Sequence, residues 1–348
     1  MKTANWLTVC FVIISTAVCS AAQRKNDSTK SDNLIEQNIV TAQNLLKTGD
    51  AAAAVGILQT ALQSSPQNVK VKFWLGKAFY SQGNYRKTIE NLSGIADKFP
   101  KNSSEQIQIV QMLGLSHYVL GQLAEAIPYF EKITQRQPEN GEVSYALGVS
   151  YIQTRQPAKS RETFAGLFKV PTNSALAYLL NAKMHVRQQF EETAEIELNK
   201  ALELDPKIPE VRFVLGELAI YRAEIDKGIE LLKQEITLNP ANAMAYYRLG
   251  EGLSRQLKWD EAIPPLQKSI WLNPFFSGPY IVLGKVYLKK QDLGNAENLL
   301  RRSTQIDPNN FGAHYLLGQV LQQAGKTEEA KAEFALAEKL RGSGEKEP

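Results

Sequence analysis

The sequence predicts an all-α protein in which about nine short helix hairpins are stacked one on another. Two observations lead to this prediction. Within residues 246–274, apolar residues recur at helical spacing on both sides of a short polar break, so two helices fold back on each other. The same pattern then returns along most of the chain. Because one hairpin cannot bury its apolar face alone, neighbouring hairpins are expected to stack on it.

Prolines mark the length of the repeated unit. A proline cannot continue a helix and biases the preceding residue away from helical dihedral angles, so each is expected to end a unit. Most of the intervals between them are 34 residues long. These prolines are Pro66, Pro100, Pro138, Pro171, Pro206, Pro240, Pro274 and Pro308.

Each unit also repeats a small residue in its first helix and a large residue in its second. A small residue at a helix crossing lets the two backbones approach closely. The small residues are Ala42, Gly76, Gly114, Gly148, Ala182, Gly216, Gly250, Gly284 and Gly318. The large residues are Leu58, Leu92, Phe130, Phe164, Leu198, Leu232, Leu266, Leu300 and Phe334.

This pattern resembles the tetratricopeptide repeat (TPR) family over residues 35–342. The resemblance implies a right-handed superhelical solenoid of TPR helix-turn-helix repeats. It also implies a concave groove, lined by the first helix of each unit, that receives an extended or helical peptide. The family is defined by a scaffold and not by a reaction, so the resemblance implies no catalytic activity.

Residues 1–22 are predicted to be a secretory signal peptide, because Lys2 precedes the apolar run Trp6–Val18 and small residues end at Ala22. The run is shorter than the roughly 20 residues that span a bilayer. Cleavage and export, to the periplasm or the exterior, are therefore expected, with an uncleaved anchor as the alternative. Membrane association is expected only through this leader.

The rest of the chain divides into three predicted parts. Residues 23–33 form a flexible polar spacer, residues 34–342 form the solenoid and residues 343–348 form a disordered tail. About four extra residues at 101–106 predict a joint within the solenoid. Both cysteines lie in the leader, so disulfides are not expected to stabilise the mature chain.

No catalytic, metal or cofactor site is predicted. His117, His185 and His314 are far apart in the sequence and take places that tyrosine holds in other units, so packed histidines are expected. Phosphate-binding loops and zinc-protease motifs are missing. The charge is nearly balanced, with 40 basic and 36 acidic residues and no basic run, which argues against nucleic-acid binding. A small-molecule substrate is not expected either.

The resemblance, matched position by position, assigns a set of residues to the peptide-binding groove. Aromatic and aliphatic anchors between charges of both signs suit a peptide or a partner helix. The same aromatic residues are also ordinary for packing between repeats, which is the competing interpretation. The assigned residues are Phe73, Lys77, Tyr80, Tyr118, Tyr145, Leu179, Lys183, Phe213, Glu217, Tyr247, Glu251, Ile281, Lys285 and Tyr315.

The leading hypothesis is a non-catalytic, exported scaffold that binds a segment of a partner protein in its groove. By resemblance to exported bacterial members, the partner is expected in an envelope complex, with the protein acting as an assembly adaptor. The alternative is a structural protein whose end repeats stack on another copy. An enzyme would need a catalytic domain, and the sequence outside the repeats is too short to form one.

Overall fold

The computed structural model describes residues 32–344, and all regular secondary structure in this part of the chain is helical. The predicted signal peptide, most of the predicted spacer and the end of the predicted tail lie outside the described residues. Within the described residues, no helix combines the length and the apolar character that a membrane crossing requires. The predicted all-α repeat fold is confirmed.

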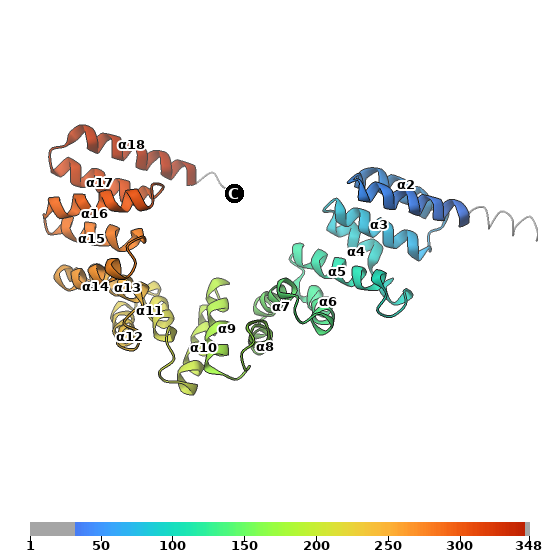
Figure 1. The fold of residues 1–348 in the computed structure, drawn as a ribbon, viewed down its shortest axis with the longest axis horizontal. Helices are drawn as coiled ribbons and strands as arrows, with labels where there is room; N and C mark the ends of the chain where they lie inside the picture. Colours follow the sequence, from blue (N-terminus) through green and yellow to red (C-terminus); the bar gives the residue numbers. More distant parts are fainter. Residues whose placement is uncertain (1–31, 345–348) are drawn as a thin grey trace, which may run out of the picture. The chain divides into compact units, whose positions relative to one another are not determined.

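The chain divides into two compact units, of which unit 1 ends at Lys169. Its described part contains four helix hairpins, drawn from blue to dark green in Figure 1. Their helices are residues 32–47, α2 (Ala51–Ser64), α3 (Val69–Ser81), α4 (Tyr85–Leu92), α5 (Ser104–Val119), α6 (Leu123–Arg136), α7 (Gly141–Gln153) and α8 (Pro157–Phe168). A short 3-10 helix, η1 (Ala96–Lys98), follows α4.

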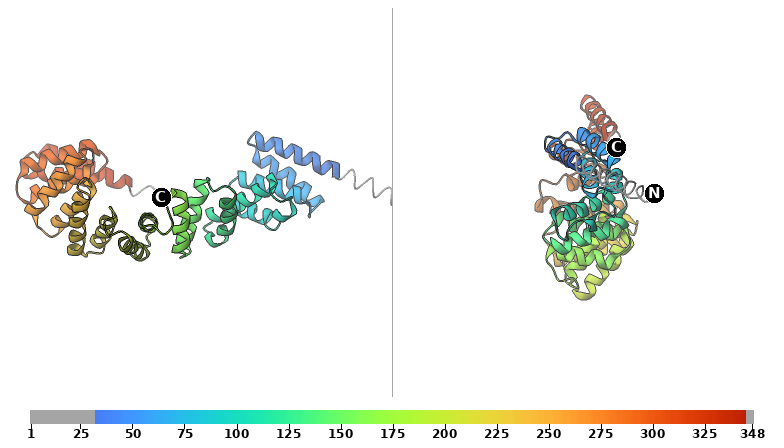
Figure 2. Two further views of the ribbon diagram at one scale, coloured as in Figure 1. Left: turned by 60° about the horizontal axis from the view of Figure 1, so that its bottom comes forward. Right: turned by 90° about the vertical axis from the view of Figure 1, so that its right-hand side faces the viewer.

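Unit 2 begins at Val170 and contains five hairpins in its described part. Within unit 2, Figures 1 and 2 show each hairpin packed against the next. The helices are α9 (Ala175–Arg187), α10 (Glu191–Leu204), α11 (Val211–Tyr221), α12 (Ile225–Leu238), α13 (Ala243–Arg255), α14 (Trp259–Leu272), α15 (Ser277–Lys289), α16 (Leu293–Ile306), α17 (Phe311–Gln323) and α18 (Thr327–Gly344).

The turn inside each hairpin needs one residue with a positive φ angle, which ends the first helix in a left-handed conformation. Glycine holds this position in four hairpins, and other residue types hold it in five. The residues are Gly49, Gly83, Gly121, Arg155, Gln189, Ala223, Leu257, Gln291 and Gly325. The same turn therefore forms with and without glycine, because the stacked helices on both sides hold it in place.

Many first helices begin with an asparagine that caps the helix. The Asn68 side chain accepts a hydrogen bond from the Val71 backbone N–H at the start of α3. Asn140, Asn242 and Asn310 cap α7, α13 and α17 in the same way. Each cap pairs one of the backbone donors that the first turn of a helix leaves free.

The small and large residues predicted in each unit meet in the middle of its hairpin. A β-carbon built on Gly250 would lie 2.4 Å from Cγ of Leu266, and one on Gly148 would lie 2.5 Å from Cζ of Phe164. Leu266 and Phe164 are completely buried. Glycine therefore makes room for the large side chain of the partner helix, which packs directly on the backbone.

The extra residues at 101–106 lie inside unit 1, and the two compact units divide instead at residues 169 and 170. A single core cluster bridges the insertion, with Phe73 and Leu92 on one side of it in sequence and Ile109 and Leu113 on the other. Because these side chains pack together, the longer loop does not separate the hairpins on its two sides.

Candidate functional site

In unit 1, one predicted groove residue is covered. Phe73 on α3 is only 2% exposed, and its ring packs edge-on against Phe99, with ring centroids 5.6 Å apart. Phe99 directly follows η1, before Pro100 and the extra residues at 101–106. Phe73 is therefore a core residue without surface for a partner, which corrects its assignment to the groove.

The other predicted residues of unit 1 keep accessible surface, and they are Lys77, Tyr80, Tyr118 and Tyr145. Lys77 donates a hydrogen bond of 2.7 Å from Nζ to Oε1 of Gln108, which joins α3 to α5. Partial burial lowers the pKa of Lys77. Burial, followed by the nearby Tyr145 hydroxyl, raises the pKa of Tyr118. The accessible predicted residues of unit 1 are thus mostly aromatic, with one cation.

In unit 2, Leu179 also belongs to the core, where it is buried in one cluster with Ile208 and Val211. Its assignment to the groove is corrected for the same reason as that of Phe73. Phe213 is half-buried and packs against two neighbouring core clusters, which makes it chiefly a link between hairpins. The remaining predicted residues keep accessible surface: Lys183, Glu217, Tyr247, Glu251, Ile281, Lys285 and Tyr315.

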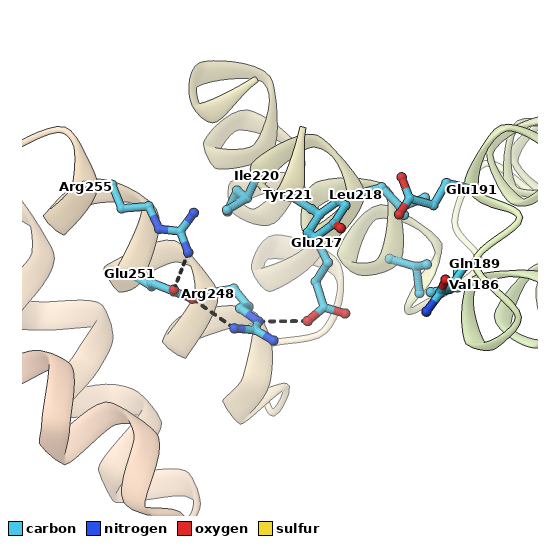
Figure 3. Close-up of a pocket in the computed structure, with 11 residues that line it drawn as sticks. Val186, Gln189, Glu191, Glu217, Leu218, Ile220, Tyr221, Arg248, Glu251 and Arg255 are labelled. Carbon is cyan, nitrogen blue, oxygen red and sulfur yellow. Dashed lines mark hydrogen bonds and ion pairs between the residues drawn. The ribbon is translucent and has the colours of Figure 1, made fainter. Parts of the chain in front are cut away.

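A cavity of about 660 Å³ opens among the first helices α9, α11 and α13 of unit 2. Figure 3 shows its lining, in which Glu217 and Arg248 reach toward each other between α11 and α13. Val186, Val214 and Leu218 form an apolar part of the wall. We call this cavity the first-helix pocket. Its volume lies in the range of roughly 300–1,000 Å³ that is usual for ligand sites.

Four charged side chains form a continuous chain of ion pairs along one side of the first-helix pocket. Arg248 donates from Nε to Glu217 over 2.8 Å and from Nη1 to Glu251 over 2.9 Å. Arg255 donates from Nη2 to the other oxygen of Glu251 over 2.7 Å. Burial disfavours the charge on Arg248, but the hydrogen bonds to Glu217 and Glu251 outweigh it and raise its pKa. The chain therefore holds α11 and α13 in one arrangement.

Tyr247 lies beside this chain of ion pairs. Its ring packs edge-on against Phe276 with centroids 5.0 Å apart, and the Arg248 guanidinium lies 5.1 Å from the ring centroid. Burial, followed by the charge of Glu251, raises the pKa of Tyr247. Of the predicted groove residues, Glu217 and Glu251 thus line the first-helix pocket, and Tyr247 packs against Arg248 outside its lining.

Sequence reasoning missed Arg248, Arg255 and Tyr221 as residues of this site. A signal was present, because the position of Arg248 is Val214 and Val282 in the neighbouring units. Arg248 and Arg255 also stand three residues before and four after Glu251, the spacings at which side chains meet on a helix. A charged residue such as Arg248 at a position that is apolar in the neighbouring repeats indicates a local role outside the core.

The histidines occupy packed positions. Nδ1 of His314 lies 2.6 Å from a Glu333 carboxylate oxygen, and its Nε2 lies 3.0 Å from the Pro308 carbonyl oxygen. His185 is buried, and burial lowers its pKa to about 4. The described residues contain no group of three or more potential metal-binding side chains.

Comparison with known proteins identifies the repeat. The family model described as tetratricopeptide repeat matches residues 45–111, 120–184 and 287–341, more than half of the chain. The chain belongs to the tetratricopeptide repeat family. The matched ranges leave out residues 185–286, yet the TPR hairpins continue there with the same turns and the same packing. TPR proteins are in general non-catalytic interaction scaffolds.

Two curated relatives are similar to about half of this chain. Human protein O-mannosyl-transferase TMTC1 is 25% identical over 169 residues, which are 47% of this chain and 19% of the relative. The TPR repeat-containing protein YpiA of Bacillus subtilis is 19% identical over 170 residues, which are 49% of this chain and 40% of the relative. The chain thus spans less than half the length of these relatives.

Among solved structures, MamA from Desulfovibrio magneticus RS-1 aligns with a TM-score of 0.45 and 21% sequence identity. The alignment covers 49% of this chain and 96% of the solved MamA chain.

Proposed function

We propose that this chain is a non-catalytic scaffold that binds a segment of a partner protein on the first-helix face of its hairpins. The observation that supports the proposal is the first-helix pocket, which three consecutive first helices share. A site built from three repeats requires the stacked array, because no single hairpin supplies its walls. The proposed binding site therefore exists only where the hairpins are stacked.

First helices of unit 2 beyond the pocket also carry exposed side chains that suit protein binding. Tyr315 on α17 is 51% exposed, and Lys285 on α15 is exposed as well. Tyrosine adds a large contact area at a small cost in side-chain entropy, and charges fix the register of a partner. Folding alone does not require these side chains to face water.

The absence of a catalytic role is part of the proposal. A mannosyltransferase occurs among the relatives, but this chain covers only 19% of that protein. The shared segment consists of repeats, and repeats of this kind hold partners without reacting with them. The activity of that relative therefore does not extend to this chain.

Export to the envelope is the second part of the proposal. It depends on the sequence of residues 1–22, with its basic start, apolar run and small residues before Gln23. We propose that the exported scaffold takes part in the assembly of an envelope complex. Fractionation followed by determination of the N-terminal residue tests this part, with Gln23 as the expected first residue of the exported chain.

Site-specific photocrosslinking in cells tests the binding face. A crosslinking amino acid replaces Tyr221 or Lys285 on first helices, and Ile196 or Trp271 on second helices as matched controls. All four side chains are exposed, so the fold is expected to tolerate each replacement. One partner protein is expected to crosslink from both first-helix positions and from neither control.

Two other results would contradict the proposal. Crosslinks that form only from Ile196 and Trp271 would place the partner on the second helices. Crosslinks from the first helices to another copy of the same chain would favour the self-associating alternative.

A further inference from the structure

The first-helix pocket combines an apolar wall with charged groups, which indicates a ligand that has both an apolar part and a charged part. Val214 and Leu218 are buried and present hydrocarbon to the cavity. The Tyr221 ring, 77% exposed, stands at the same pocket and leaves both its face and its hydroxyl free for contact. A long side chain with an aliphatic stem and a polar head would contact both kinds of surface.

The charges in the pocket decide the sign of that head group. The lining holds three carboxylates, Glu191, Glu217 and Glu251, and two guanidinium groups, Arg248 and Arg255. The lining therefore carries a formal excess of one negative charge. In a cavity that is partly shielded from water, such an excess attracts a cation more strongly than it would on an open surface.

The two arginines are already paired with protein carboxylates. Glu251 accepts hydrogen bonds from both of them, one at each of its oxygens. Arg248 is also bonded to Glu217. An anionic ligand would have to compete with these carboxylates for the arginines and would meet their repulsion.

Two carboxylates of the lining, Glu217 on α11 and Glu191 at the start of α10, can still accept hydrogen bonds from a ligand. Among the described residues, the hydrogen bond to Glu217 engages only its Oε1, which leaves Oε2 as an acceptor. Glu191 lies 3.5 Å from Nε of Arg222, but Arg222 makes its shorter bond, 2.5 Å, to Glu195 outside the pocket lining. Figure 3 places Glu217 near the middle of the lining, between Arg248 and Tyr221, and Glu191 farther along the lining, beyond Leu218.

From this geometry we infer that the first-helix pocket takes a lysine or arginine side chain of the bound protein segment. The aliphatic stem lies on Val214 and Leu218, and the cationic head donates hydrogen bonds to Glu217 and is attracted by Glu191. The Tyr221 ring covers the cation from the solvent side. The inference rests on the proposed function, because it names a feature of the segment that the first-helix face binds.

Fluorescence anisotropy with the full chain tests the inference. The probe is a labelled, end-capped heptapeptide of alanine and leucine with a central arginine, compared with versions that carry citrulline or glutamate. Citrulline has the shape of arginine without its charge. At low salt, the arginine peptide is expected to bind about tenfold more tightly than the citrulline peptide, and the difference shrinks as salt rises.

Two charge-matched variants locate the effect. Glu217→Gln keeps an acceptor for Arg248 but removes the charge, so the preference for arginine is expected to fall to about twofold or less. Glu192→Gln removes the same charge from the exposed residue next to Glu191, outside the pocket lining, and is expected to keep the full preference. Circular dichroism melting confirms that both variants fold.

Several outcomes would overturn the inference. These are equal binding of the arginine and citrulline peptides, tighter binding of the glutamate peptide, no binding of any peptide, or an unchanged preference in Glu217→Gln. None of them would contradict the proposed function, which the crosslinking pattern in cells decides independently. Conversely, a charge preference in vitro without crosslinks from Tyr221 or Lys285 would contradict the proposed function alone.

Discussion

Replacing Gly250 with alanine is expected to destabilise unit 2, although alanine is the better helix former. Gly250 lies on α13, where its missing side chain makes room for Leu266 of α14. A new β-carbon would lie 2.4 Å from Cγ and 2.7 Å from Cδ2 of Leu266. Leu266 is completely buried, so it cannot avoid the contact by turning toward solvent.

The magnitude follows from two opposing effects. Inserting a methyl group into a close-packed core costs about 1–3 kcal/mol. Replacing a helical glycine by alanine contributes about 1 kcal/mol in the other direction. The contact is much shorter than the roughly 3.5–4.0 Å of an ordinary carbon–carbon contact, so the cost is expected near its upper end. A net loss of about 1–2 kcal/mol in the free energy of unfolding is expected.

Urea unfolding followed by circular dichroism measures the loss, and native-state hydrogen exchange shows whether it concentrates in α13 and α14. Gly166→Ala is the matched control, because Gly166 lies within α8 and a β-carbon there meets nothing within 4 Å. That control is expected to stabilise by up to about 1 kcal/mol. If Gly250→Ala also raised the urea midpoint, the packing argument would be wrong.

Two further predictions concern a buried histidine and a turn. Burial lowers the pKa of His185 to about 4, below its value of about 6.5 in the unfolded chain, so between these values the unfolded chain binds a proton that the folded chain does not. As the pH drops from 7 to 4, the free energy of unfolding of the parent should therefore fall by about 3 kcal/mol more than that of His185→Leu. Urea titrations at both pH values measure the two losses, and equal losses would refute the prediction. Leu257 is exposed with a φ of 61°, and glycine adopts this conformation without steric cost. Leu257→Gly should therefore increase the free energy of unfolding by about 1 kcal/mol and raise the urea midpoint. Leu257→Ala, which keeps the β-carbon, should give little of this gain, and an equal gain from both variants would show that the turn is not strained.

The candidate site was predictable only where its residues follow the repeat. Glu217 and Glu251 stand 34 residues apart at one position of the unit, and the structure places both at the first-helix pocket. Arg248 was missed, because its position is apolar in the neighbouring units and its role depends on contacts with two helices. A pattern averaged over repeats does not reveal a residue that departs from it.

The sequence by itself determined the helices, their pairing into hairpins and the meeting of small and large residues within each hairpin. These features depend on neighbours less than one repeat apart, such as Gly250 and Leu266, so the local pattern contains them. Only the tertiary structure decided which residues at equivalent repeat positions reach the surface. Phe73 is covered by Phe99 from the loop after η1, whereas Tyr315 stays half exposed. The exposure of a side chain depends on what the adjacent loops and hairpins place over it, and that differs between repeats even where the pattern is the same.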